Sequence, residues 1–253
     1  SDVKACVRMA VKEGSTRRRD EVRTFRSTTA ALLQLADWMG DSQVELVVME
    51  ATGDYWKPVF YLLEQHFRVW LVNARDIKKV PGRRTDVSDA RWIARVAQHG
   101  LVSPSFVPPP PIRRLRDLTR QRTNLVRERA RVLNRLEKVL EDAGIKTSLV
   151  LSKTLSMSSR AMIEALIARE RDPVTLADLA IGKARAKISD LRDALIGNFT
   201  DHHAFLAAQA LRHIHFIDRQ IAGFDQRIGS ELQPFQSQLS DLTTIPGVST
   251  RVA

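Results

Sequence analysis

Residues 44–54 read VELVVMEATGD, and this stretch decides the fold of the first half of the chain. A short apolar run bounded by turn residues is typical of a buried strand, which here ends at Glu50. Gly53 then marks a tight turn from the strand into a helix. Working outward, we expect that helix over residues 54–66 and a further strand over residues 68–73 (RVWLVN).

The other elements of the first hundred residues continue this alternation. Short β-type runs cover residues 3–9 and 21–25, and a helix with a Ser/Thr cap is expected over residues 28–38. A polar, basic loop over residues 74–85 precedes a helix over residues 86–98. Strands that alternate with helices predict an α/β layer fold.

A proline-rich connector, residues 104–111 (PSFVPPPP), separates this half from the second half of the chain. Proline lacks an N–H donor and fixes φ, so such a run forms a stiff, extended connector. We therefore expect one domain over residues 1–103, a linker with a helical region over residues 104–240, and the start of a further domain over residues 241–253.

Two apolar seams run through the helical half with the 3-4 spacing of coiled coils or long helical hairpins. The first comprises Leu115, Leu118, Leu125, Val132, Leu136 and Val139, and the second Ile214, Ile217, Ile221, Phe224, Ile228 and Phe235. Arg122 and Arg129 occupy the two remaining positions of the first seam. We expect the seams to pair protomers into a homo-oligomer, a dimer or larger, and an ordinary helical bundle is the alternative.

The composition favours a nucleic-acid partner. The 253 residues carry a net charge of +11 with a pI of about 10.4, which attracts phosphate backbones; a solvated basic surface is the alternative. Cys6 is the only cysteine, which excludes an internal disulfide and a thiolate metal site and is typical of a reducing cytoplasm. No apolar stretch reaches the ~20 residues that span a bilayer, so we expect a cytoplasmic protein without a membrane partner.

Three carboxylates are candidate metal ligands and catalytic residues. Glu50 ends the buried strand, whereas Asp86 and Asp89 lie three apart at the start of a helix and project from one face. Mg²⁺ prefers oxygen ligands such as carboxylates, and two such ions can support phosphodiester cleavage. The alternative is structural, with Asp86 as an N-cap, Asp89 stabilising the helix dipole and Glu50 facing solvent.

Two clusters of basic residues are candidate nucleic-acid contacts, because arginine suits bidentate phosphate binding. One cluster lies in the loop before residue 86 and the other in the helix after the prolines. They comprise Lys78, Lys79, Arg83 and Arg84 in the loop, and Arg113, Arg114, Arg116, Arg120, Arg122 and Arg127 in the helix, which also holds Arg129, Arg131 and Arg135. The alternatives are an ordinary surface loop and a solvated helix face whose arginine stems cover the seam.

Two further groups have an ordinary structural interpretation. Tyr55 and Trp56 are candidates for stacking on a base, but core positions are the more common role of such residues. Four histidines share one predicted helix and are interpreted as helix residues rather than as a metal cluster. They are His202, His203, His213 and His215.

Four segments carry a resemblance to a known family. They are residues 47–64 (VVMEATGDYWKPVFYLLE), 71–94 (LVNARDIKKVPGRRTDVSDARWIA), 105–122 (SFVPPPPIRRLRDLTRQR) and 242–253 (LTTIPGVSTRVA). Together, and in this order along nearly the whole chain, they resemble the insertion-sequence 110 family of transposases.

The resemblance implies an RNase H-like domain similar to the RuvC resolvase, then a helical coiled-coil region and a second domain with a nucleophilic serine. It implies RNA-guided DNA recombination, with DNA and a structured non-coding guide RNA as partners. In that family three aspartates and one glutamate bind Mg²⁺. By resemblance, Glu50 matches the tetrad glutamate, and Asp86 and Asp89 match its last two aspartates.

The chain departs from the family pattern near both ends. The first tetrad aspartate, in an opening strand with a Gly-Ile-Asp-like motif, has no counterpart, and we count two strands before the first helix where an RNase H-like sheet has three. None of the serines, Ser240 and Ser249 included, is a supported nucleophile, and residues 245–248 (IPGV) resemble either the hairpin of a helix-hairpin-helix or a plain turn. We therefore expect a partial form of the transposase that is inactive alone. A non-catalytic RNA- or DNA-binding fragment and a RuvC-like junction-resolving nuclease are the alternatives.

Overall fold

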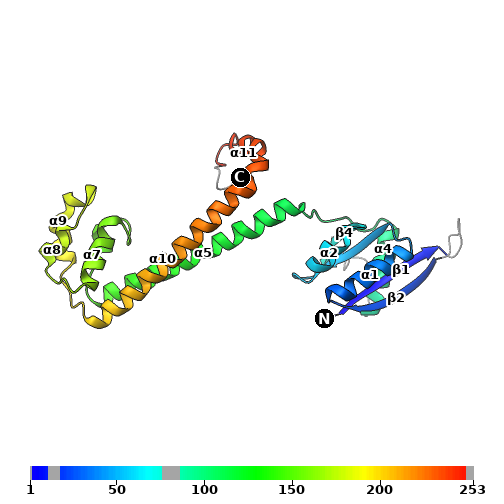
Figure 1. Cartoon of the computed structure of the whole chain (residues 1–253), viewed down its shortest axis with the longest axis horizontal. Helices are drawn as coiled ribbons and strands as arrows, with labels where there is room; N and C mark the ends of the chain where they lie inside the picture. The colour runs from blue at the N-terminus through cyan, green and yellow to red at the C-terminus, as the bar shows by residue number, and fades with distance from the viewer. Residues whose placement is uncertain (1, 11–17, 76–85, 249–253) are drawn as a thin grey trace. The chain divides into compact units, whose positions relative to one another are not determined.

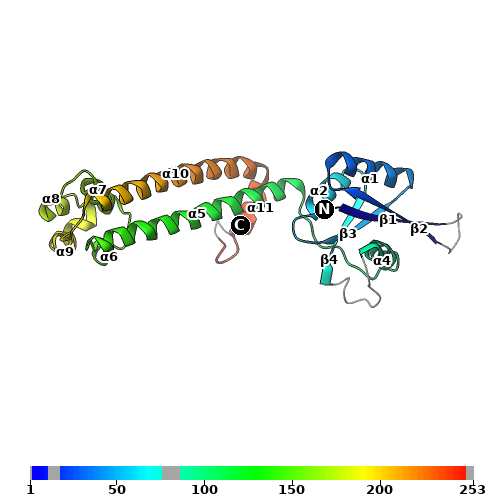
Figure 2. The ribbon, with the colours of Figure 1, turned by 90° about the horizontal axis from the view of Figure 1, so that it is seen from below.

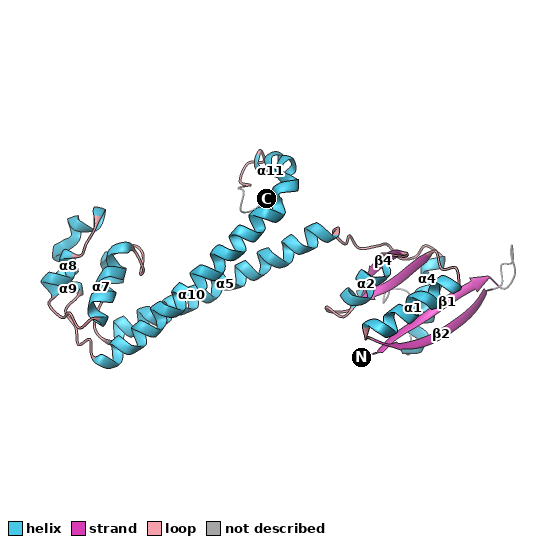
Figure 3. Ribbon diagram, viewed as in Figure 1, coloured by secondary structure: helices cyan, strands magenta, loops and turns pink. Residues whose placement is uncertain are grey.

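The computed structural model describes residues 2–10, 18–75 and 86–248, and the chain divides into two compact units (Figure 1). Unit 1 covers residues 1–108 and unit 2 covers residues 109–253. All the described strands belong to unit 1, whereas the described part of unit 2 is helical (Figure 3). Within the described residues, no helix combines the length and the apolar character that crossing a membrane requires.

Unit 1 alternates strands and helices in the order that its sequence predicts. Its described elements are β1 (Asp2–Ala10), β2 (Arg18–Arg26), α1 (Thr29–Asp41), β3 (Leu46–Ala51), α2 (Trp56–Leu63), β4 (Arg68–Asn73) and α4 (Asp86–Gln98). The predicted cap of the first helix is Thr28, whose side chain accepts a hydrogen bond from the Ala31 N–H. The mixed α/β character is therefore confirmed.

The four described strands form two separate two-stranded sheets rather than one. β1 and β2 pair antiparallel, with Cys6 opposite Val22, and β3 and β4 pair parallel, with Glu50 opposite Val72. Among the described strands, β1 pairs only with β2 and β3 only with β4. The alternation of strands and helices predicts one β-sheet layer. In the structure this layer consists of two half-sheets, β1-β2 and β3-β4.

Helices pack on both faces of these strands. α1 and α2 contribute Leu35 and Leu63 to a core that also holds Val47 of β3. The next residue, Val48, packs in a different core with Val96 of α4. Successive residues of a strand point to opposite faces, so α1 and α2 cover one face and α4 covers the other.

The proline connector is shorter than its sequence predicts. Residues 101–109 have no regular structure, but α5 begins at Pro110, with Pro109 as its N-cap residue. Pro110 and Pro111 therefore lie in the first turn of a helix, where the N–H that proline lacks would have no intrahelical partner. The expectation of an extended connector was wrong for these two prolines.

Unit 2 is built on two long antiparallel helices, α5 (Pro110–Asp142) and α10 (Asp201–Leu232) (Figure 2). Short elements connect them at one end of the pair, namely α6 (Thr147–Val150), α7 (Met157–Ile167), α8 (Pro173–Asp178), the 3-10 helix η1 (Gly182–Lys187) and α9 (Ile188–Ala194). The 3-10 helix η2 (Gln233–Phe235) and α11 (Gln236–Thr243) come after α10. The 3-10 helix η1 continues directly into α9.

Residues 245–248 form a turn. The Val248 N–H donates to the Ile245 carbonyl over 3.0 Å, and Gly247 between them has a φ of +85°. Proline at the second position and a glycine with positive φ at the third are the signature of a type II turn. The described residues therefore fit the plain-turn interpretation of this motif.

The apolar parts of the two predicted seams pack against each other within one chain. Val132 and Leu136 of α5 share a core with Ile214 and Ile217 of α10, and none of the four is more than 2% exposed. The helical-hairpin alternative is therefore confirmed for this stretch. The expectation that these residues pair protomers needs correction, because their apolar surface is already buried within the chain.

The two arginines at polar seam positions face acids on the opposite helix. Arg122 forms an ion pair with Asp225. Arg129 does the same with Asp218, with 2.5 Å between Nε and Oδ1. These pairs align α5 with α10 and satisfy charges that would otherwise face the apolar seam.

Candidate functional site

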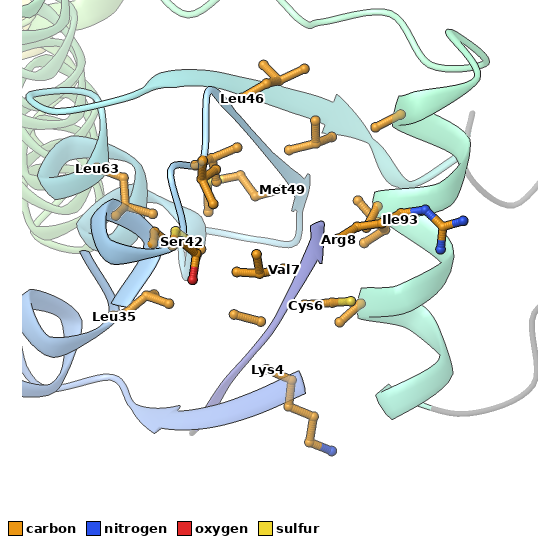
Figure 4. A pocket seen from close by; sticks show the side chains of 18 of the residues that line it. Lys4, Cys6, Val7, Arg8, Leu35, Ser42, Leu46, Met49, Leu63 and Ile93 are labelled. Atoms are coloured by element: carbon orange, nitrogen blue, oxygen red, sulfur yellow. The ribbon is translucent and has the colours of Figure 1, made fainter. Parts of the chain in front are cut away.

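A cavity of about 1540 Å³ lies between β1 and β3 in unit 1 (Figure 4). Its lining includes residues 2–9 of β1 and residues 46–50 of β3. Side chains from α1, α2 and α4 complete the wall. The cavity therefore occupies the space between the two half-sheets.

Two of the three predicted metal ligands, Glu50 and Asp89, line this cavity. Glu50 lies two residues after Val48 in β3, so the pleat of the strand places it on the face that α4 covers. Asp89 lies in the first turn of α4 itself. The structure thus brings two carboxylates, separated by 39 positions in the chain, to the same cavity.

Asp86, the third predicted ligand, is the first residue of α4. Residues three apart on a helix share a face, so its position is compatible with a site that includes Asp89. Its side chain lies outside the described residues. Among the residues whose side chains the structure describes, no group of three His, Cys, Asp or Glu could hold a metal ion. The three-ligand set therefore stays a prediction.

The β1 wall of the cavity contributes cations beside these carboxylates. Lys4, Cys6 and Arg8 line it, and Cys6 and Arg8 lie beside α4 (Figure 4). Arg8 is held in place on two sides. Its Nη1 lies 2.6 Å from Oδ1 of Asp20, and its Nε donates to Oε1 of Gln98 over 2.6 Å. A positive wall opposite carboxylates suits the binding of a phosphate group near a cation.

The Cys6 thiol also lines this cavity. Burial raises its pKa to about 11; Asp20 raises the pKa further, and Arg91 and Arg8 act in the opposite direction. Without a bound metal the thiol is therefore protonated at neutral pH. The carboxylates of Glu50 and Asp89 supply oxygen donors, the ligands that Mg²⁺ prefers.

The predicted basic loop cannot be placed against this cavity. Lys78, Lys79, Arg83 and Arg84 lie outside the described residues. Their role in delivering a phosphate backbone stays a prediction.

Some of the predicted nucleic-acid arginines of α5 have a structural role. Arg122 directs both Nε and Nη2 at the carboxylate of Asp225, and its assignment to nucleic acid stays a prediction. Nε of Arg114 lies 3.6 Å from Oε2 of Glu231, and Arg113 is half-buried in the first turn of the helix. The remaining three, Arg116, Arg120 and Arg127, are exposed.

These three arginines belong to a longer row of exposed cations on α5. We call this set the cation row: Arg116, Arg120, Arg127, Arg131, Arg135 and Lys138. Spacings of three, four and seven residues keep its members on one side of the helix over about 33 Å. Two surface depressions lie along the row, and none of its six members pairs with another described residue in an ion pair.

Arg131 and Arg135 belong to the arginines that the sequence of this helix offers for phosphate contact, whereas Lys138 was not predicted. Lys138 continues the 3-4 spacing of the preceding arginines out of phase with the apolar seam. That periodicity is the signal that would have found Lys138.

Tyr55 does not occupy a core position, as its side chain is 77% exposed. Trp56 packs edge-to-face on Phe60 and Tyr61, at centroid distances of 5.5 and 6.0 Å. The core interpretation is therefore wrong for Tyr55, whereas Trp56 belongs to an aromatic cluster on α2.

The four histidines lie in α10 and have separate partners. His203 bonds Thr200 and Asp142, His213 lies 3.4 Å from Glu128, and His215 lies 3.5 Å from Arg160. The ring of His202 contacts the ring of His203 edge-to-face, with 5.9 Å between the ring centroids. The buried Nε2 of His215 has no hydrogen-bond partner within the described residues. The separate partners of the four histidines fit their interpretation as helix residues.

Comparison with known proteins gives the family of the chain. Residues 4–145 match the model of the family DEDD_Tnp_IS110, which is described as Transposase. A search of the curated proteins finds no match. The matched region is more than half of the chain and contains most of β1, all of β2 to β4 and α4, both Glu50 and Asp89, and all of the cation row. The chain therefore belongs to the insertion-sequence 110 family of DEDD transposases.

Proposed function

We propose that unit 1 is the RNase H-like catalytic domain of a DNA transposase that cleaves and exchanges DNA strands with the help of Mg²⁺. The observation that carries this proposal is the presence of Glu50 and Asp89 at one cavity, on the α4 side of β3. Asp86, one helical turn before Asp89, would be the third ligand.

The residues of the cavity fit a hard divalent cation. Carboxylate oxygens, the ligands that Mg²⁺ prefers, are available from β3 and α4. When bound, Mg²⁺ polarises the phosphodiester and activates the attacking oxygen. Glu50, Asp86 and Asp89 would hold the ion. Lys4 and Arg8 would neutralise the phosphate group at the opposite wall.

The cation row of α5 is the proposed track for a nucleic-acid backbone. Six exposed cations along about 33 Å of helix match the continuous negative charge of DNA or of a structured guide RNA. Guanidinium groups can contact phosphate oxygens in pairs. The guide RNA, a homo-oligomer and a cytoplasmic location remain predictions from the sequence and the resemblance.

A metal titration tests the site. Mg²⁺ or Mn²⁺ binding to the chain would be measured by calorimetry for the wild type, Glu50→Gln and Asp89→Asn. We expect each variant to bind about tenfold or more weakly, because each removes a charged oxygen ligand. Glu45→Gln is the matched control, since Glu45 lines the same cavity at the other end of β3 and should leave the affinity unchanged.

Equal metal affinity in all four proteins would remove the metal-site assignment. So would recombination in cells by a transposition-competent transposase that carries Glu50→Gln.

A second candidate function is non-catalytic binding of RNA or DNA. The observation that favours it is the cation row, which lies outside unit 1 and needs no metal. Nucleic-acid binding that survives with no measurable Mg²⁺ affinity would favour this function over catalysis.

A further inference from the structure

We propose that unit 2 carries a docking surface for an acidic amphipathic helix of a partner protein. The surface lies at the end of the α5–α10 hairpin where the short helices connect the two long ones (Figure 2). We call it the tip patch and define it by three apolar and three basic residues: Leu149, Met157, Ile181, Lys153, Lys183 and Arg185. The proposal goes beyond the transposase function and does not depend on it, since the match to that family ends at residue 145.

The first argument is the exposure of the three apolar side chains. Leu149 of α6 and Met157 of α7 are 79% and 76% exposed, and Ile181, just before η1, is 55% exposed. Their neighbours Leu151 and Ser158 are buried, so packing fixes the backbone that presents them. Exposed apolar side chains that gather on one surface are typical of a protein contact.

Two hydrogen bonds bring these apolar residues to one surface. The Ile181 N–H donates to Oγ of Ser158 over 2.9 Å, which joins the start of η1 to the first turn of α7. Nζ of Lys187 donates to the Val150 carbonyl over 2.7 Å, which joins the end of η1 to the end of α6. The six residues of η1 span about 12 Å between these two bonds. The exposed side chains therefore belong to one patch.

The second argument is the charge around these side chains. Residues 143–163 and 179–189, which contain the whole tip patch, include no acid. Lys153, Lys183 and Arg185 are exposed, and no ion pair between described residues uses them. Apolar side chains beside unpaired cations complement an apolar surface that is flanked by carboxylates. The charge of the tip patch thus favours an acidic partner.

The third argument separates a protein partner from nucleic acid. Residues 146–198 contain no Phe, Trp, Tyr or His, so the tip patch offers no ring on which a base could stack. Phosphate groups would contact the cations but would leave Leu149 and Met157 in water. A protein partner removes these apolar side chains from water as well, which is favourable. The occupant is therefore a protein.

The fourth argument concerns the backbone of the occupant. The described part of unit 2 is helical and offers no strand edge to which a peptide could add. The occupant therefore has to satisfy its own backbone hydrogen bonds, as a helix does. A helix with apolar residues on one face and acids beside them matches both the apolar and the basic residues of the tip patch.

A designed acidic peptide tests the tip patch in the full chain. The probe would be Glu-Leu-Ala-Glu-Leu-Leu-Glu-Glu-Leu-Ala-Glu-Leu-Leu-Glu-Glu, labelled with fluorescein, and its binding would be followed by fluorescence anisotropy. We expect saturable binding that weakens as the salt concentration rises, because ion pairs at an exposed surface are screened. A peptide of the same composition, with its leucines spread around the helix, should not bind.

The apolar contribution is tested by substitutions at exposed positions. Leu149→Ala combined with Met157→Ala should weaken binding about tenfold or more, because both side chains would be central to the contact. Val174→Ala is the matched control, since Val174 is an exposed aliphatic residue of α8 with acids at residues 172 and 178. It should leave the affinity unchanged. Circular dichroism of each variant would verify that the helices are intact.

The charge contribution is tested separately. Lys183→Gln combined with Arg185→Gln should weaken binding and reduce its dependence on salt. Arg192→Gln is the matched control, because Nη2 of Arg192 already lies 3.5 Å from Oδ1 of Asp178. A peptide with lysine in place of every glutamate should not bind the wild type.

The opposite results overturn the proposal. Absence of binding by the acidic peptide, or equal affinity in the wild type and both patch variants, would exclude this docking surface. Loss of DNA binding by the variant that lacks Leu149 and Met157 would assign the tip patch to nucleic acid. Dissociation of an oligomer by the same variant, seen by sedimentation, would assign it to a second copy of the chain.

Discussion

At the residue scale, the cavity of unit 1 is lined by carboxylates, by cations and by one thiol. The carboxylates of Glu50 and Asp89 reach a wall that also carries Lys4 and Arg8. Cys6, between those two cations on β1, keeps its proton instead, because desolvation dominates the nearby charges. The same cavity thus carries carboxylate oxygens and a protonated sulfur.

The Cys6 thiol predicts a loss of stability at high pH. The unfolded thiol ionises near 9.0, whereas burial raises the pKa of the folded thiol to about 11. The folded state therefore binds more protons between these values, and the free energy of unfolding should fall as the pH rises through this window. Urea unfolding of the wild type and Cys6→Ser at about pH 8 and about pH 10.5 measures the effect.

Cys6→Ser removes this titration while other groups that ionise in the same range remain. The fall in stability should therefore be smaller in the variant. An identical fall in both proteins would show that the thiol is not buried as the structure has it.

At the element scale, the hairpin of α5 and α10 depends on one close approach of backbone. A Cβ on Gly197 would lie 2.3 Å from the Ala143 carbonyl oxygen and 2.9 Å from Cδ1 of Ile145. Because the first obstacle is backbone, Gly197→Ala should destabilise unit 2 by about 1–3 kcal/mol. Thermal or urea unfolding followed by circular dichroism would measure this.

Gly223→Ala is the matched control for that substitution. Gly223 lies inside α10, and a Cβ there would meet nothing within 4 Å. Alanine favours a helix over glycine, so this variant should gain about 0.5–1 kcal/mol. A destabilisation of the same size in both variants would contradict the close contact at residue 197.

The cation row predicts a specific salt dependence of nucleic-acid binding. Each phosphate contact that is lost should lower the slope of log K against log salt by about 0.9 for duplex DNA or about 0.7 for single strands. Arg120→Gln with Arg127→Gln should therefore reduce the slope by nearly 2 for a duplex. Arg212→Gln, at an exposed position of α10, is the control and should leave it unchanged. A slope that all variants share would exclude the row as the contact surface.

At the scale of the whole molecule, the two units have separate cores. The core of unit 2 is formed by α5, α10 and the short helices between them, and the cores of unit 1 use residues of β1 to α4 and the connector. Residues 109–253 expressed alone should therefore unfold cooperatively, with helical circular dichroism and a midpoint close to that of unit 2 in the full chain. A fragment without a cooperative transition would contradict this division.

Much of the fold can be predicted from local sequence patterns. The strand at residues 68–73 and the helix at residues 86–98 were predicted with the bounds that the structure has, because apolar periodicity and turn residues are local signals. The boundary of the connector was placed less well. Two of its prolines lie in the first turn of α5. A helix tolerates proline there, so the length of the proline run did not show where the helix begins.

The site was predictable only in part. Glu50 and Asp89 were identified by their chemistry and by the resemblance, and the α/β alternation placed them near strand and helix ends. The cation row was incompletely predicted, because Lys138 was left out although it continues the spacing of the arginines before it. The ion pair between Arg122 and Asp225 was not predicted, because the sequence does not say which acid lies across from Arg122.

The sequence by itself determined the order of strands and helices, the excess of positive charge and the residue types able to hold Mg²⁺ or phosphate. Only the tertiary structure decided that the two apolar seams pack against each other within one chain, and that Glu50 and Asp89 line one cavity between β1 and β3. The physical reason is the distance along the chain over which each signal acts. Helix and strand signals act over a few residues, whereas these contacts join segments tens of residues apart, whose pairing depends on the packing of every element between them.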